Sequence, residues 1–173
     1  MIIPRTQGDE DGLCGLYSIL NAMRYLYPRM SEDTEAAIFK ASALALNRWP
    51  KILWDGTTTA DMLRMLKSVY LGIPVHVGLR IAVREPFRRR KPSAGAFYDR
   101  LFGLVEPENQ VAIIGLEKPY EHWTVAREVR SQAILLQDSA KLHEIWRHEI
   151  GLPGSKAKWQ IDPRCTFLIT RTT

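Results

Sequence analysis

The sequence predicts an α+β fold in which N-terminal helices pack on a C-terminal, mostly antiparallel β-sheet. Apolar residues recur at helical spacing in the first half of the chain, and the period changes to that of strands in the second half. Of the 173 residues, 46% are hydrophobic, which is enough to bury a core. No internal repeat, low-complexity tract or linker interrupts the chain, so we expect one domain over residues 1–173.

The first two helices are predicted from apolar stripes and from their ends. The first begins close to Cys14, and Pro28 ends it. Its apolar face comprises Leu16, Ile19, Leu20, Met23 and Tyr27. Ser31 is the expected N-cap of the second helix. The apolar face expected there comprises Ala36, Ala37, Ile38, Ala41, Leu44 and Ala45.

A third helix and a series of strands follow. Residues 57–72 read as the helix, because Thr58 and Asp61 have the spacing of a capping box and Gly72 is a stop signal. Strands are expected at residues 73–83, 110–116, 122–129, 133–137 and 165–171, with a short helix at 96–104.

Cys14 lies where a loop becomes a helix, and it is either a core residue or a nucleophile. A free cysteine is usually buried. However, the apolar stripe of this helix centres nearly opposite Cys14, whose own side carries Ser18, Asn21 and Tyr25. Gly12 and Gly15 leave room for another backbone or a substrate. The first turn of a helix also stabilises a thiolate, although the acidic residues 9–11 oppose this effect.

A nucleophilic cysteine needs a base, and the chain has four histidines. His76 falls inside an apolar strand, where a core or sheet role is expected. His143 and His148 do not have zincin spacing, and we expect them at the surface. His122 opens a strand directly after a turn, which favours a functional role.

Asp138 is the expected partner of His122. If residues 122–129 and 133–138 pair through a turn at 130–132, Asp138 lies opposite Trp123 or Thr124. In the second register it shares a face with His122, one diagonal position away. Cys14, His122 and Asp138 then form a possible nucleophile, base and orienting group.

Gln7, followed by "DGLCGLYS", "HWTVA" and "LLQDSA", resembles the papain-like cysteine peptidase superfamily, most closely its C39-like bacterial branch. The resemblance implies a papain-like fold in which Cys14 is the nucleophile, His122 the base and acid, and Asp138 the orienting residue. It also implies that Gln7 donates to the oxyanion hole with the backbone N–H of Cys14. Two features depart from papain: the spacing from Gln7 to Cys14 is one residue longer, and no aromatic-rich continuation follows Gly15.

Charge and composition limit the other classes of protein. Two cysteines cannot form a disulfide framework, and the N-terminus has no signal-peptide pattern. We therefore expect a cytoplasmic protein, or one exported without a recognisable signal peptide, with no membrane span and with no cofactor or metal. The net charge is +5, and basic residues concentrate at Arg84–Pro92. This segment is either a solvated loop or a dock for an acidic partner; no nucleic-acid-binding motif accompanies it.

The sequence thus predicts a cysteine peptidase that hydrolyses an amide bond of a protein or peptide substrate. Two alternatives stay open. A glutamine deamidase or transglutaminase-type acyl transferase would use the same triad. An inert interaction domain would instead bind through the basic residues 88–91.

Overall fold

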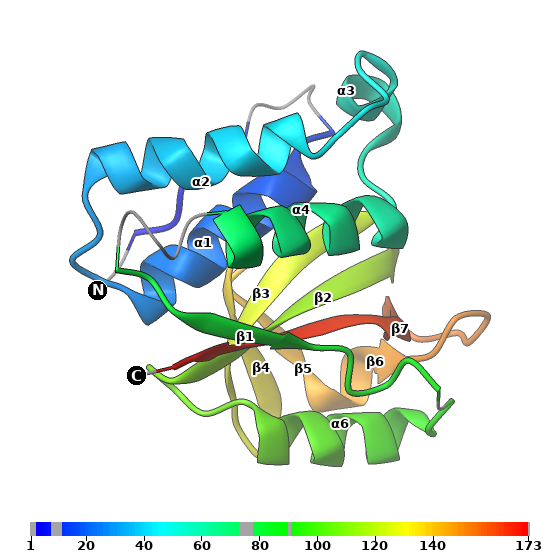
Figure 1. Ribbon diagram of the computed structural model, residues 1–173. Coiled ribbons are helices and arrows are strands. Elements are labelled where there is room, and N and C mark those ends of the chain that lie inside the picture. The colour runs from blue at the N-terminus through cyan, green and yellow to red at the C-terminus, as the bar shows by residue number, and fades with distance from the viewer. Residues whose placement is uncertain (1–2, 8–11, 73–77, 90, 173) are drawn as a thin grey trace.

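One seven-stranded sheet forms the centre of the molecule, and helices cover both of its faces (Figure 1). The structure is a computed structural model that describes residues 3–7, 12–72, 78–89 and 91–172. Its helices are α1 (Cys14–Leu26), α2 (Glu32–Leu44), α3 (Lys51–Asp55), α4 (Thr59–Gly72), α6 (Ala94–Leu104) and the short 3-10 helix η1 (Arg147–Glu149). Its strands are β1 (Ile81–Arg84), β2 (Gln110–Lys118), β3 (His122–Val129), β4 (Ala133–Gln137), β5 (Glu144–Trp146), β6 (Ile150–Gly151) and β7 (Trp159–Arg171).

The sheet is mostly antiparallel. Its strand order is β1-β7-β2-β3-β4-β5, and β6 pairs in parallel with β7. The α+β prediction is therefore confirmed, with helices in the N-terminal half and the sheet in the C-terminal half. No helix within the described residues is long and apolar enough to cross a membrane.

Alternating side chains of the central strands divide the core in two, because successive residues of a strand point to opposite faces. Val111 and Ile113 pack with α1, α2 and α4 on one face. Ala112 and Ile114 pack with α6 on the other. Both faces of β2 and β7 are therefore buried, which explains why these strands carry long apolar runs.

Several predicted ends coincide with the observed ones. β3 and β4 have the predicted bounds, α1 begins at Cys14 and α4 ends at Gly72. Other predictions were too short: β7 begins at Trp159, six residues before the predicted strand. α3, β5 and β6 were not predicted, because they are short and have no complete period. Of the strand predicted at 73–83, residues 73–77, including His76, lie outside the described residues.

The predicted apolar face of α2 was correct at Ile38, which is fully buried, and wrong at Leu44. Leu44 is 75% exposed, whereas the residues buried on α2 are Thr34, Glu35, Ile38 and Ser42. Glu35 is buried because both Arg5 and Arg24 bind its carboxylate. An alanine-rich segment does not define one apolar side, so polar contacts with the neighbouring segments determine which side faces inward.

Candidate active site

Cys14 is the first residue of α1 and is buried, with 7% of its surface exposed. One turn later, the hydroxyl of Ser18 donates to the backbone carbonyl of Trp123 at 2.7 Å. This bond fixes the polar side of α1 to β3 directly beside His122. The side of α1 that carries Cys14 therefore faces the sheet, and its polar residues hold the helix there.

The glycines flanking Cys14 allow a second segment to approach the start of α1. A Cβ atom at Gly12 would lie 2.6 Å from the carbonyl oxygen of Ile52 and 2.7 Å from the nitrogen of Gly56. A Cβ at Gly15 would lie 2.2 Å from Oγ1 of Thr57. The expected close approach of another backbone is therefore present, and it brings residues 52–57 against the N-terminal end of α1.

His122 and Asp138 form a buried pair on neighbouring strands. Val125 of β3 pairs with Gln137 of β4, which places Asp138 opposite Thr124, in the second of the two predicted registers. Nε2 of His122 lies 2.7 Å from Oδ1 of Asp138. The other carboxylate oxygen accepts the backbone N–H groups of Ala140 (2.8 Å) and Leu142 (3.0 Å). The turn after β4 therefore fixes the carboxylate that orients the imidazole.

The surroundings of His122 favour its charged form. Burial lowers the pKa of His122, but hydrogen bonds with Asp138 and with the Cys14 side chain outweigh burial and raise the pKa to about 9. For Asp138, burial raises the pKa, whereas the bond with His122 and the other bonds to the carboxylate bring it below its usual value. Since Asp138 holds Nε2, Nδ1 is the ring nitrogen left to face Cys14. The three predicted residues therefore meet in the order thiol, imidazole, carboxylate.

A cavity of about 480 Å³ opens beside Cys14 and His122. Residues 55–59 form one wall, and residues 115–118 and 121–123 of the β2–β3 hairpin form much of the rest. Cys165 also lines the cavity, with its Sγ 3.1 Å from Oγ1 of Thr59. Its predicted place in a C-terminal strand is confirmed, but it is half-buried at the cavity and not enclosed in the core. Burial raises the pKa of the Cys165 thiol, which disfavours its thiolate.

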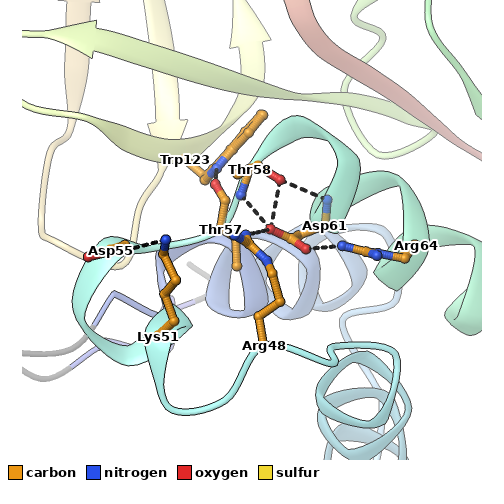
Figure 2. Close-up of polar contacts among 8 residues, drawn as sticks. All are labelled: Arg48, Lys51, Asp55, Thr57, Thr58, Asp61, Arg64 and Trp123. Carbon is orange, nitrogen blue, oxygen red and sulfur yellow. Dashed lines mark hydrogen bonds and ion pairs between the residues drawn. The ribbon is translucent and has the colours of Figure 1, made fainter.

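Asp61 holds Thr58 in the wall formed by residues 55–59 (Figure 2). Its carboxylate accepts the N–H and the hydroxyl of Thr58 and binds Arg48 and Arg64. Burial raises the pKa of Asp61, but these bonds outweigh it and lower the pKa to about 2. The hydroxyl of Thr58 accepts the Asp61 N–H in return, so the predicted capping box is confirmed.

Trp123 connects this wall to the strand that carries His122. Its indole N–H donates to the carbonyl of Thr57 at 2.8 Å, as Figure 2 shows. Gly115 lies under the indole, since a Cβ there would lie 3.2 Å from the Trp123 ring and 2.8 Å from Cβ of Cys165. In the sequence, Trp123 and Ser18 are distinguished only as neighbours of predicted site residues. Their polar atoms meet partners more than 60 positions away, so no local pattern indicates these bonds.

Gln7 is joined to the site through Ser139, the residue after Asp138. Its backbone N–H donates to the Ser139 carbonyl at 3.4 Å, and its Oε1 accepts the Ser139 hydroxyl at 3.0 Å. Gln7 therefore lies near the Asp138 end of the His122–Asp138 pair. Residues 8–11, which contain the acidic residues that opposed a thiolate, lie outside the described residues.

The remaining polar candidates lie elsewhere. His143 and His148 are exposed, as predicted. Arg88 binds Glu85, and Arg90 lies outside the described residues. In the part of the chain that the structure describes, no three His, Cys, Asp or Glu side chains are grouped so that they could hold a metal ion.

A scan against models of protein families finds no match for the chain, and no curated protein matches it. Its function is therefore inferred from the geometry of these residues and from the motifs they occupy.

Proposed function

We propose that the protein is a thiol hydrolase that cleaves an amide bond of a protein or peptide through Cys14, His122 and Asp138. The observation that carries the proposal is the buried His122–Asp138 pair, 2.7 Å apart, which contacts Cys14 at the edge of a cavity. A structural cysteine needs neither a charged imidazole nor access to a cavity. The resemblance of the motifs to papain-like peptidases supports the same reaction.

The chemistry follows from the protonation states. The charged imidazole of His122 faces the sulfur of Cys14, and the thiolate is the nucleophilic form of a cysteine. The thiolate attacks the carbonyl carbon, and the carbonyl oxygen takes the electron pair as an oxyanion. His122 then protonates the leaving amine as the C–N bond breaks, giving a thioester. His122 next takes a proton from water, which attacks the thioester and releases the acid and the thiolate.

The acceptor of the acyl group distinguishes the related reactions. Attack by water on a peptide thioester is hydrolysis, and the same step after attack on a glutamine side chain is deamidation. Attack by an amine gives acyl transfer. All three use the same triad, so the products have to be identified. Mass spectrometry of protein substrates separates them, because they give a new chain terminus, conversion of an amide to an acid, and a cross-link, respectively.

The first test compares the two cysteines of the native protein. Iodoacetamide at neutral pH should modify Cys14 much faster than Cys165, whose thiolate is disfavoured by burial. Peptide mapping by mass spectrometry measures both rates. Equal rates, or faster modification of Cys165, would contradict the proposal.

The second test uses variants and a library of fluorogenic dipeptide amides. Cys14→Ser should abolish turnover with little change in thermal unfolding, and His122→Ala should abolish turnover and slow the alkylation of Cys14. Cys165→Ser is the control, since it changes a thiol lining the same cavity without altering the triad. Three results together would show that the chain is an interaction module. These are resistance of Cys14 to labelling, absence of turnover of any substrate, and salt-sensitive binding of acidic proteins by Cys14→Ser.

A further inference from the structure

A second cavity lies beside Asp138 and is separate from the cavity that Cys14 and His122 line. Its volume is about 590 Å³, and Asp138 is the one triad member among the described residues of its lining. Within the described part of the chain, the two cavities share no lining residue. Sites for small molecules typically have volumes of about 300–1,000 Å³. The second cavity is therefore large enough for a ligand of its own.

Much of its wall is apolar. The apolar side chains come from the N-terminal segment, from α1, and from β4 and the turn after it; they are Ile3, Pro4, Tyr25, Leu136 and Leu142. Tyr25 and Leu142 are half-buried, and Ile3 is 75% exposed. The wall thus leaves apolar surface in contact with water, and a ligand with an apolar part would gain free energy by covering it.

The charged part of the lining is mainly basic. Arg127, Lys141 and His143 line the cavity, and none of them forms an ion pair among the described residues. Asp138 is paired with the charged His122, and its second oxygen is bonded to backbone N–H groups of the following turn. The carboxylate of Asp138 therefore does not pair with the three basic side chains.

A β-bulge positions Arg127. β3 pairs with β4 at Ala126–Leu136 and at Glu128–Leu135, so Arg127 is the extra residue between the two pairs. Arg127 is half-buried, and its Nε donates to the Leu136 carbonyl at 3.3 Å. Its two terminal nitrogens have no hydrogen-bond partner among the described residues. The N–H groups of a guanidinium match the two oxygens of a carboxylate, so this side chain is suited to bind one.

We propose that this cavity binds a small amphipathic carboxylate, which is an apolar chain or ring that ends in one carboxyl group. The carboxylate binds Arg127, with Lys141 and His143 close by, and the apolar part covers the wall at Tyr25 and Leu136. The inference does not depend on the proposed function, because the site uses neither Cys14 nor His122.

The bonds already made at the cavity favour a small acid over a peptide. A peptide carries an N–H and a carbonyl at almost every residue, and these groups need partners when they are buried. The Leu136 N–H donates to the His143 carbonyl at 2.9 Å, and the Leu136 carbonyl accepts Arg127. The Leu142 N–H donates to Asp138. These backbone groups of the wall are thus already bonded, and the half-buried guanidinium is left to bind a single negative charge.

The test uses octanoate as the probe, with octanol and acetate as comparison ligands. Isothermal titration calorimetry measures their affinities for the full chain. Octanoate should bind at one site, and octanol and acetate should bind at least tenfold more weakly, since each lacks one of the two parts that the cavity contacts. NMR locates the probe. The ring protons of His143 should shift on addition of octanoate, whereas the indole N–H of Trp123, which lines the other cavity, should not.

Two substitutions test the basic side chains. Arg127→Gln should weaken octanoate binding by about 10- to 100-fold, as expected for the loss of hydrogen bonds to a charged group. Lys141→Asn should weaken it by about two- to fivefold, because Lys141 is exposed and water screens its charge. Asparagine is chosen there because it tolerates the left-handed backbone of Lys141, whose φ is 63°. Thermal unfolding checks that both variants are folded.

Arg171→Gln is the matched control. Arg171 also donates to a backbone carbonyl, that of Leu26 at 3.3 Å, and makes no ion pair among the described residues. It does not line the cavity, so its substitution should leave octanoate affinity unchanged.

Three results would overturn the inference. The first is equal affinity for octanol and octanoate, or unchanged octanoate affinity in both Arg127→Gln and Lys141→Asn. The second is a shift of the Trp123 indole signal without one of His143, because the probe would then lie in the cavity beside Cys14. The third is binding of an acetylated alanyl-leucine dipeptide but not of octanoate, which would assign the cavity to a peptide C-terminus. None of these measurements uses turnover, so failure of the proposed hydrolase would leave the inference intact, and the reverse also holds.

Discussion

The chemistry of the site depends on a charge that a buried histidine would ordinarily lose. Burial alone lowers the pKa of His122, yet its bonds with Asp138 and Cys14 raise the pKa to about 9. Below its ordinary pKa of about 6.5, the ring is protonated in both the folded and the unfolded chain, so the pairing contributes its full stability there. That contribution decreases as the pH rises from about 6.5 through 9.

Asp138→Asn tests this electrostatic arrangement. The amide can still bond to the ring but lacks the negative charge, so the pKa of His122 should fall and the ring should be largely neutral at pH 7 to 8. NMR titration of the His122 ring protons measures this shift. The rate of Cys14 alkylation at neutral pH should fall with it, because less imidazolium faces the sulfur. His143→Ala, at an exposed position, should change neither quantity. An unchanged His122 titration in Asp138→Asn would show that Asp138 does not hold the proton on the ring.

The shape of the cavity beside Cys14 depends on how closely residues 52–59 approach the start of α1. Gly15 is the point of contact, because a Cβ there would lie 2.2 Å from Oγ1 of Thr57 and 2.7 Å from Sδ of Met62. Thr57 in turn accepts the indole N–H of Trp123, beside His122. Displacement of residues 52–59 would therefore be transmitted to β3, the strand that carries His122.

Gly15→Ala should destabilise the protein by about 1–3 kcal/mol, the usual effect of overpacking, and should reduce turnover. Gly103→Ala is the matched control, since it is also a helical glycine but a Cβ there has no atom within 4 Å. It should stabilise the protein by about 0.5–1 kcal/mol, because alanine favours the helix. Denaturant unfolding measures both changes. Equal effects of the two substitutions would mean that the wall does not need the close approach at Gly15.

The elements that could be predicted from sequence are those with complete local signals. Thr58 and Asp61 predict the start of α4, because both partners of the capping box lie within one turn. The short turn expected at 130–132 limited Asp138 to two registers, and the observed register is the second of them. In contrast, the buried face of α2 depends on Arg5 and Arg24, which lie on other segments, so its alanine pattern was misleading.

In the candidate site, the sequence indicated Cys14, His122 and Asp138 but not the residues that hold them in place. Cys14, His122 and Asp138 each have a local feature: the start of a helix, the start of a strand, and the end of its partner strand. The residues that hold these three side chains in place have no such local feature. Ser18 and Ser139 are short polar residues in ordinary surroundings, and their roles come from partners 105 and 132 positions away. The sequence likewise did not indicate that Cys165 shares a cavity with Cys14.

The basic segment at residues 88–91 contains Lys91, whose charge acts on Asp162 of β7. Burial raises the pKa of Asp162, but bonds from Arg164 lower it, and the charge of Lys91 lowers it further. The charge of Asp162 also acts on Cys165, which lines the cavity. Lys91 is therefore within electrostatic reach of a residue near the cleft. Reversal of one charge of this segment tests whether it attracts an acidic protein substrate.

Arg89→Glu tests whether this attraction contributes to turnover. Arg89 is exposed and makes no ion pair among the described residues, so its substitution reverses a charge without breaking a contact. A change of two charge units, acting through water over about 10 Å, changes the rate of encounter with a charged substrate by about two- to fourfold at low salt. We therefore expect kcat/KM on an acidic protein substrate to fall by this factor. Added salt should lower the wild-type value toward that of the variant, since charges are screened over about 8–10 Å.

The comparison needs one control substrate and one control variant. A neutral dipeptide amide should be hydrolysed equally by the wild-type protein and by Arg89→Glu, because the proposed reaction uses only Cys14, His122 and Asp138. Lys40→Glu makes the same change of charge on the exposed side of α2, at a site with no ion pair among the described residues. If both reversals lower kcat/KM equally, the effect comes from the net charge of +5 as a whole. If neither does so and salt has no effect, the segment only solubilises the chain, and substrate selection depends on the walls of the cavity around Cys14.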